Sequence, residues 1–363
     1  KLDMGVRIRT YEDYSEQTMK TAGRVVAGLH QRPEYNIRIE QDFPKLSLFP
    51  TDMWRDTSVA EAIQQALIPL FHTNFERVAW LVKLNSSTIE LAYDKGSINS
   101  NGREEAINEI EIELVEGEIK DLFVLAQLLF SRLTLRPGVK SKAARGYALW
   151  RQEPMPSEQS LEINHHNEGV LGAFINGVGQ CLNQIQCALD TYFTSRRLQD
   201  LSVFVDALAS LRHGFWLFND YMSSKSRSLR AEISHFIQLF SWVDNAIYLQ
   251  ELMNKTGNYR KKLDYSEQLV EQLKLEKRRF PDHENITELL CSERFNKLQL
   301  ALLELIVKEE LSEYFCSVSE TVNLRQFARR KLDDSLAELH KGIMDYQHLN
   351  VGQFIEQRPI LHR

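Results

Sequence analysis

The sequence predicts an α+β protein in which an antiparallel β-barrel with a charged lumen is followed by an all-α helical bundle. Three observations lead to this fold class. Short segments of alternating polar and apolar residues fill the first third of the chain, and several of them carry charged residues on one face. The second half instead shows apolar residues at helical spacing. A chain of 363 residues with 43% hydrophobic content suits about two such domains.

The most informative segment is residues 109–114, EIEIEL, in which three glutamates alternate with three aliphatic residues. Successive side chains on a strand point to opposite faces, so we expect Glu109, Glu111 and Glu113 to share one face and the aliphatic residues to share the other. The alternative is an ordinary half-buried strand whose acids merely face water.

Three earlier segments place basic or polar residues on one face in the same way. These residues are Arg7 and Arg9, then Thr18 and Lys20, then Arg32, Glu34 and Asn36. Many short antiparallel strands close into a barrel or a sandwich, and the charged rows favour a barrel, because a sandwich needs apolar residues between its sheets. Such a lumen would suit a polyanion held with a divalent metal. A lumen lined only by salt bridges is the alternative.

We expect strands at residues 6–10, 16–22, 32–40, 76–84, 87–96 and 108–117, and helices at 57–71 and 119–133. Turns or loops are expected at residues 22–31, 83–87, 94–102 and 135–150, where glycine and polar residues gather. Asp94 precedes Lys95-Gly96, so it could be either a site residue or a turn residue. Arg38 and Lys83 are expected on outer faces.

The overall composition argues against nucleic-acid and membrane partners. The net charge is −6 and neither half is basic, which argues against a nucleic-acid partner. The four cysteines form no CxxC pair and are typical of a cytoplasmic protein with reduced thiols. A signal peptide and an apolar run of membrane-spanning length are both missing, so we expect no membrane partner. The first residue is Lys1 rather than Met, so we expect the chain to begin inside a domain.

Four segments of the first half resemble a known family. The blocks MGVRIR, TMKTAGRVVAGLHQRPEYNI, EIEIELVEG and LRPGVKSKAARGYAL, in this order, resemble the CYTH domain of the triphosphate tunnel metalloenzymes. The match is closest to the bacterial two-domain form, in which CYTH precedes CHAD and acts as an inorganic triphosphatase. It covers most of residues 4–150. The resemblance implies an eight-stranded antiparallel tunnel and metal-dependent hydrolysis of inorganic triphosphate (tripolyphosphate) to diphosphate and phosphate, with Mg²⁺ or Mn²⁺.

Carried over to this chain, the resemblance implies distinct groups of site residues. The cations that hold phosphate oxygens would be Arg7, Arg9, Lys20, Arg32 and Arg77, with Glu34 orienting them. The metal would be held by Glu109, Glu111 and Glu113, joined by Glu90 and Asp94. One mouth of the tunnel would be closed by Lys142 and Arg145, which also bind substrate. The expected catalytic residues are Arg9, Lys20, Glu111 and Lys142. The family's N-terminal Glu-x-Glu-x-Lys strand has no counterpart here and is expected upstream of Lys1.

The expected domains are a CYTH tunnel at residues 1–150, a linker at 151–160 and a CHAD-like helical bundle at 161–363. Helical spacing in the last part is shown by Leu201, Phe204, Val205, Leu208 and Leu211, and by Phe236, Leu239, Phe240, Val243 and Ile247. The segment LASLRHGFWLF resembles CHAD, a resemblance that implies polyphosphate binding by basic residues. Candidates are Arg212-His213, 260–262, 277–279 and 329–331, although solvated helix ends are the interpretation that we prefer.

Together these features predict a cytoplasmic, metal-dependent inorganic triphosphatase. One alternative is an organic triphosphate hydrolase or an adenylate cyclase on the same tunnel. Another is a non-catalytic protein that binds polyphosphate.

Overall fold

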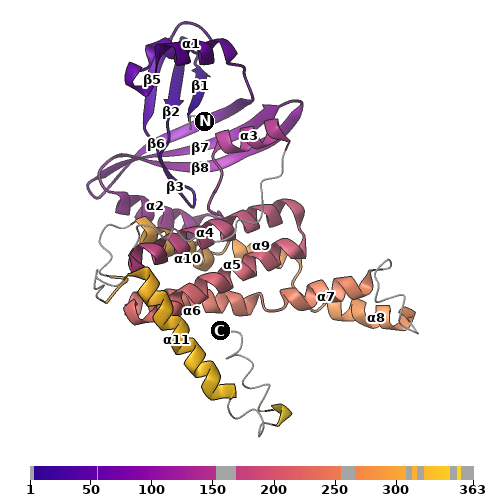
Figure 1. Cartoon of the computed structure of the whole chain (residues 1–363). Coiled ribbons are helices and arrows are strands. Elements are labelled where there is room, and N and C mark those ends of the chain that lie inside the picture. The colour runs from indigo at the N-terminus through magenta and orange to yellow at the C-terminus, as the bar shows by residue number, and fades with distance from the viewer. Residues whose placement is uncertain are drawn as a thin grey trace. The chain divides into compact units, whose positions relative to one another are not determined.

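A computed structural model describes residues 4–54, 56–152, 169–254, 266–307, 313–316, 323–343 and 350–352. The chain divides into two compact units, Lys1–Pro156 and Ser157–Arg363. Within the described residues, all named strands lie in the first unit, and the second is built from helices (Figure 1). Most of the expected linker, residues 153–160, lies outside the described residues, as do residues 161–168. No described helix combines the length and the apolar character needed to cross a bilayer.

The first sheet has one apolar and one polar face. Its strands, in spatial order, are β1 (Gly5–Thr10), β2 (Ser15–Lys20) and β5 (Glu34–Ile39), all antiparallel. Met19 on the apolar face is buried against Leu46 and Phe49, and Val6 and Ile37 pack against the same cluster. Because successive side chains alternate, burying this face commits the charged residues of the same strands to the other face.

Two glutamine side chains, Gln17 from the sheet and Gln64 from a later helix, bind the backbone of residues 44–46 just after β5. Gln17 of β2 is fully buried, accepts a hydrogen bond of 2.8 Å from the backbone N–H of Lys45 and donates one of 3.0 Å to its carbonyl. Gln64 makes the same kind of pair, with the N–H of Leu46 and the carbonyl of Pro44, both at 2.7 Å. These bonds satisfy backbone groups that would otherwise be buried without partners. They fix the segment that holds the three helices η1 (Leu46–Leu48), η2 (Thr51–Met53) and α1 (Thr57–Ala66).

Helix α1 ends five residues earlier than expected. Leu67 is already extended, with φ −65° and ψ 128°. Pro69 explains the early end, because a proline disfavours helical geometry at the residue before it and cannot donate a helical hydrogen bond.

The second sheet is longer than the sequence pattern predicts. Its antiparallel strands are β6 (His72–Leu84), β7 (Ser87–Ser100) and β8 (Arg103–Glu116). The expected turn at residues 94–102 is wrong, since β7 continues to Ser100 and the chain reverses only at Asn101 (φ 51°) and Gly102 (φ 74°). Gly96 is therefore a strand residue. A Cβ there would lie 2.1 Å from the carbonyl oxygen of Asn74, so a close approach of β6 explains this glycine.

Two expected loops contain regular structure. Residues 22–31 hold the hairpin of β3 (Arg24–Val26) and β4 (Leu29–Gln31), which turns at Ala27 (φ 48°) and Gly28 (φ 87°). Such a two-residue turn with positive φ values matches the twist of a hairpin. Residues 135–150 were expected to be a loop, but most of them belong to α3 (Lys142–Arg151), whose N-cap Ser141 accepts a hydrogen bond from the N–H of Ala144 at 3.2 Å. Because glycine and basic residues gather in this segment, the sequence pattern did not predict the short capped helix.

The described strands form three sheets, of three, two and three strands. Every pairing is antiparallel, as the fold class requires. These pairings do not join the described strands into one closed ring, so the eight-stranded tunnel stays a prediction. Helix α2 (Ile119–Arg132) follows β8 and packs against it, and α3 packs against all three strands of the second sheet.

The second unit is a helical bundle with an aromatic core. Phe204 and Phe236 each meet Phe295 edge to face, with ring centroids 5.8 and 4.8 Å apart. The pattern Phe236–Ile247 spans two helices, because α6 ends at Leu239 and α7 begins at Val243. Residues 260–262 lie outside the described part. The helices are α4 (Val170–Ser195), α5 (Leu198–Leu217), η3 (Asn219–Tyr221), α6 (Ser224–Leu239), α7 (Val243–Met253), α8 (Ser266–Lys277), α9 (His283–Leu290), α10 (Glu293–Val307) and α11 (Leu324–Ile343).

The substitution Gly96→Ala should lower the free energy of unfolding of the first unit by about 1–3 kcal/mol, because the added methyl group meets the backbone of β6. Calorimetry of the full chain measures this loss. Gly5→Ala is the matched control, since a Cβ at this strand glycine meets nothing within 4 Å. Equal destabilisation by both variants would show that the close approach at Gly96 has no energetic weight.

Candidate active site

The candidate site is a row of charged side chains on one face of the second sheet. The register places Arg77 of β6, Asp94 of β7 and Glu109 of β8 directly opposite one another. Residues paired in this way point to the same face, and the period of two adds further residues of the same strands. These additional residues are Glu90, Glu111 and Glu113.

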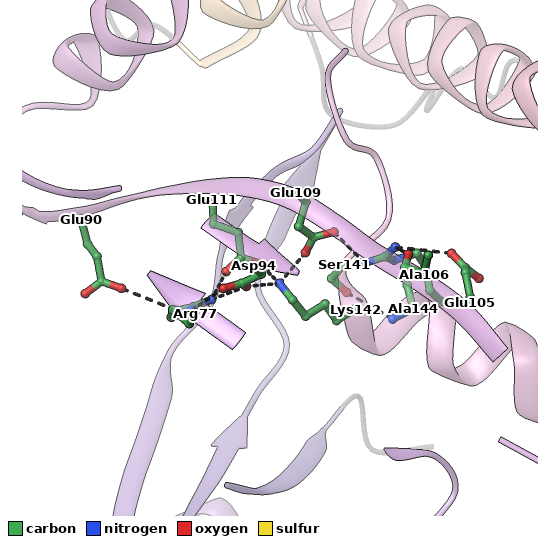
Figure 2. Close-up of polar contacts among 11 residues, drawn as sticks. Arg77, Glu90, Asp94, Glu105, Ala106, Glu109, Glu111, Ser141, Lys142 and Ala144 are labelled. Atoms are coloured by element: carbon green, nitrogen blue, oxygen red, sulfur yellow. Dashed lines mark hydrogen bonds and ion pairs between the residues drawn. The ribbon is translucent and has the colours of Figure 1, made fainter. Parts of the chain in front are cut away.

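Arg77 lies at the centre of this row and binds three carboxylates (Figure 2). Its Nε and Nη2 donate to the two oxygens of Asp94, each at 2.7 Å, in the two-pronged geometry that a guanidinium offers a carboxylate. Nη2 also donates to Glu111 Oε2 at 2.6 Å, and Nη1 lies 3.5 Å from Glu90 Oε1. Arg77 thus links three acids that would otherwise repel one another.

Two further cations reach the row from α3. Lys142, the first residue of the helix, places its ammonium 2.7 Å from Asp94 Oδ2 and 2.8 Å from Glu111 Oε1, and it also donates to Glu109 Oε1 (Figure 2). One turn later, Arg145 donates to Glu109 Oε2 at 2.6 Å. The helical spacing of three residues puts both cations on the face of α3 that contacts the sheet.

These contacts set the ionisation of the site. The Asp94 side chain is 0% exposed, and burial alone would raise its pKa. Hydrogen bonds from Arg77 and Lys142 outweigh that effect and lower the pKa of Asp94 below its ordinary value. The pKa of Glu111 is lowered in the same way, against partial burial, chiefly by Lys142. The carboxylates in turn raise the pKa of Lys142, although its burial acts in the opposite direction. All three groups are therefore charged at neutral pH.

The polar face of the first sheet carries the other predicted cations. The register aligns Arg7 with Thr18 and Asn36, and it aligns Lys20 with Glu34, so all of these share one face. Thr18 Oγ1 donates to Asn36 Oδ1 at 2.8 Å, Lys20 forms an ion pair with Glu34, and Arg9 Nη1 donates to the hydroxyl of Tyr11 at 3.0 Å. Glu34 thus contacts Lys20 and also acts electrostatically on Arg7 of the same face.

Two of the predicted phosphate-binding arginines have a buried N–H group without a partner in the described part of the chain. These groups are Nε of Arg7 and Nε of Arg145. Burial lowers the pKa of Arg7, as do its neighbour Arg9 and, more weakly, Arg77 of the second sheet. Buried donors of a cation normally find an acceptor, so an anionic ligand would complete both groups.

Some predicted residues stay outside the network. Glu113 is exposed, lies opposite Glu90 and makes none of the contacts with Arg77, Lys142 and Arg145 described above. Arg32, exposed between β4 and β5, has its aliphatic part close to Gly23. Arg38 and Lys83 were expected to be solvated on outer faces. Both are exposed, although each lies an even number of residues from a member of a charged face.

The structure also adds residues that the sequence did not single out. Glu105 Oε1 lies 3.5 Å from Arg145, and the period of two that defines the glutamate row would have found it had it been extended towards the start of β8. Phe75, two residues before Arg77, has its ring centroid 5.2 Å from the ammonium of Lys142 and 5.8 Å from the guanidinium of Arg77. Its ring face attracts both cations and limits where they can lie.

Three of the acids could hold a metal ion. Asp94, Glu109 and Glu111 each offer a carboxylate oxygen, and these oxygens lie within 4.8 Å of one another. Among the described residues, this is the group in which at least three possible ligand residues lie close enough together to hold one ion. Carboxylate oxygens are the ligands that Mg²⁺ and Mn²⁺ prefer, so the donor set fits such an ion.

The chain is similar in sequence to two known domain families and to a curated protein. The family model described as the CYTH domain matches residues 1–147, and the one described as the CHAD domain matches residues 178–363. Over 154 residues the chain is 39% identical to an inorganic triphosphatase of Haemophilus influenzae. That similarity covers 41% of this chain and 42% of the relative, so the chain spans less than half the length of the curated relative that it matches.

The substitution Asp94→Asn should destabilise the first unit by about 3 kcal/mol near neutral pH, because it leaves Arg77 and Lys142 short of a buried partner. The pKa of Asp94 is lowered in the folded state, so its charge stabilises the protein above its ordinary pKa of 3.8. This contribution is lost as the pH falls through the lower, folded value.

The difference in melting temperature between wild type and Asp94→Asn should therefore shrink between pH 7 and about pH 3. Calorimetry measures it, with Asp13→Asn as the control, because Asp13 is exposed in the β1–β2 turn. A difference that stays constant over this range would contradict the assignment of the charge.

Proposed function

The chain belongs to the family of proteins in which a CYTH domain precedes a CHAD domain, and from this membership we propose that its first unit hydrolyses inorganic triphosphate to diphosphate and phosphate. The observation that carries the proposal is the cluster of Asp94, Glu109 and Glu111 bound to cations from β6 and α3. A site that mixes acids and bases in this way can hold a polyanion together with a divalent ion. The name of the similar triphosphatase supports the same substrate.

The cations would hold the substrate. We assign phosphate oxygens to Arg7, Arg9, Lys20, Arg32, Arg77, Lys142 and Arg145, with Glu34 positioning Lys20. Arginine suits this task because its planar fork donates two parallel hydrogen bonds to one phosphate group. The unpaired Nε groups of Arg7 and Arg145 support the assignment, because each needs an acceptor that the described residues do not supply.

We assign Mg²⁺ or Mn²⁺ to Asp94, Glu109 and Glu111, with Glu90 and Glu113 further along the same face. When bound, such an ion lowers the pKa of a coordinated water and offsets negative charge on phosphate oxygens. The three carboxylates would fix its position. Without the ion, the acidic row would repel the substrate, and the reaction should therefore depend strictly on a divalent metal.

In the proposed reaction a water oxygen attacks the terminal phosphorus, the bond from that phosphorus to the bridging oxygen breaks, diphosphate leaves with the electron pair of that bond, and the proton of the water passes to solvent. Phosphoryl transfer depends mostly on position and on charge stabilisation. Arg9 and Lys20 would orient the phosphate chain, and Lys142 would stabilise charge that develops on the oxygens during the reaction. Glu111, which contacts both Arg77 and Lys142, would bind the metal next to these cations.

The remaining assignments concern the whole chain. We propose that residues 151–160 link the CYTH unit to the CHAD unit. The four cysteines include no CxxC pair, a pattern that suits a reducing compartment, so we place the reaction in the cytoplasm. Polyphosphate binding by the helical unit is kept as the alternative to solvated basic residues. Arg212 lies on α5 next to His213, and partial burial and Arg212 lower the pKa of His213, so this histidine adds little positive charge.

Release of phosphate from tripolyphosphate should require Mg²⁺ or Mn²⁺ and should stop in EDTA, because the substrate's charge needs the metal as well as the basic row. The measurement compares tripolyphosphate, ATP and thiamine triphosphate, each with either metal and with EDTA. Faster turnover of either organic substrate would favour the organic triphosphatase alternative. No turnover of any substrate would leave only polyphosphate binding.

The substitution Glu111→Gln should reduce kcat/KM for tripolyphosphate by on the order of 100-fold or more, because it removes one charged ligand while keeping the side chain's size. Glu104→Gln is the matched control, since Glu104 is exposed on the opposite face of the same strand. If kcat/KM is the same for wild type and Glu111→Gln, the metal assignment must be abandoned.

A further inference from the structure

One ammonium group touches all three members of the candidate metal site. Lys142 Nζ contacts Asp94 Oδ2 at 2.7 Å, Glu111 Oε1 at 2.8 Å and Glu109 Oε1 (Figure 2). These residues are also the carboxylate cluster that could hold a metal ion. An ammonium has three N–H donors, so three acceptors satisfy it fully. Lys142 therefore occupies the position of a bound cation.

A divalent ion and this ammonium would compete for the same oxygens. Ions such as Mg²⁺ need oxygen atoms at about 2.1 Å, and oxygens that receive a hydrogen bond from Lys142 are directed at the ammonium instead. The lysine has a means of leaving, because its charge sits at the end of a flexible four-carbon chain. The Lys142 side chain is 13% exposed, so solvent reaches part of it.

The position of Lys142 in α3 also favours its release. It is the first residue of the helix, where the aligned peptide dipoles carry partial positive charge. A cation is disfavoured at such a helix end unless acids neutralise it. The three carboxylates supply that neutralisation, and a divalent ion that binds to them would remove it. An anion would then be the natural partner for both Lys142 and the start of α3.

We propose that Lys142 is a displaceable counterion, which holds the three carboxylates together until a divalent metal replaces it and which then binds a phosphate oxygen of the substrate. This inference rests on the proposed function for the identity of the substrate. It adds an order of events, in which the metal binds first and so creates a cation for the substrate. No bond is made or broken covalently in this exchange.

The charge balance of the network gives the sign of the effect. The ion pairs join five carboxylates to three cations, which leaves two negative charges. The acids are Glu90, Asp94, Glu105, Glu109 and Glu111, and the cations are Arg77, Lys142 and Arg145. Loss of Lys142 makes the network more negative and removes the competitor, so metal affinity should rise. A lysine with a purely structural role would have the opposite effect, because its loss would disorder the ligands.

The deciding experiment is calorimetric titration of Mn²⁺ into the full chain without substrate. Lys142→Met should bind Mn²⁺ roughly tenfold more tightly than wild type, while its turnover of tripolyphosphate falls. Lys120→Met is the matched control, because Lys120 is an exposed lysine of α2 that pairs with Glu118, and its Mn²⁺ affinity should equal that of wild type. Equal or weaker binding by Lys142→Met would overturn the exchange. Wild type that binds no Mn²⁺ would instead overturn the metal site of the proposed function.

A second measurement needs no variant and covers the case in which Lys142→Met fails to fold. Acetic anhydride labels free amines, and mass spectrometry reports the extent of labelling at each lysine. Addition of Mn²⁺ to the wild-type chain should increase labelling of Lys142 several-fold, because the displaced amine loses its three acceptors. Labelling of Lys120, whose side chain is 64% exposed, should stay constant. Labelling of Lys142 that is unchanged or reduced by Mn²⁺ would overturn the proposal.

Discussion

A buried carboxylate held by two cations is the constraint on which the site depends. Asp94 is fully buried in the middle of β7, where an unpaired charge would be strongly disfavoured. Arg77 approaches it from the neighbouring strand and Lys142 from the helix that packs on the sheet. Asp94 therefore couples the sheet to α3. The partners of these two cations, Glu90, Glu109 and Glu111, then follow from the register of the strands.

In both three-stranded sheets of the first unit, the alternation of side chains places a row of charged residues on one face. In the first sheet, Met19 is buried against the segment that holds η1 and α1, and this leaves Arg7 and Lys20 on the opposite face. In the second sheet, α3 covers part of the charged face and supplies cations to it. The influence of Arg77 on the pKa of Arg7 shows that the basic face of one sheet lies within electrostatic reach of the charged row of the other. This juxtaposition is what a site for a polyanion and a metal requires.

The mixture of charges also has a chemical consequence. A row of cations alone would bind phosphate without a metal, and a row of acids alone would bind a metal without phosphate. In this chain the acids hold the cations in fixed positions while the ligands are absent. Salt bridges in the site are thus compatible with function, because the same oxygens and nitrogens can exchange partners for a metal and a phosphate.

The sequence by itself determined which residues share a face. The alternation in residues 109–114 fixes the orientation of Glu109, Glu111 and Glu113, because the period of a strand is two whatever its surroundings are. It also indicated the all-helical character of the second unit and, through the resemblance of several segments, the CYTH and CHAD families. The sequence pattern wrongly predicted turns or loops at two places where glycine or polar residues serve tertiary packing. Gly96 lies in a strand and accommodates the close approach of β6, and residues 142–151 form a helix that packs on the sheet.

Only the tertiary structure decided which charges meet. Arg77 and Asp94 are 17 residues apart, and Glu111 and Lys142 are 31 residues apart, so no local pattern specifies either contact. Strand register and the packing of α3 bring them together, and the burial of Asp94 makes its pairing with a cation obligatory. The same packing selects Asp94, Glu109 and Glu111 as the metal cluster and leaves Glu113 outside it, although all three glutamates of β8 look alike in the sequence. The reason is that alternation sets the direction of a side chain, whereas its partner is set by whichever element packs over it.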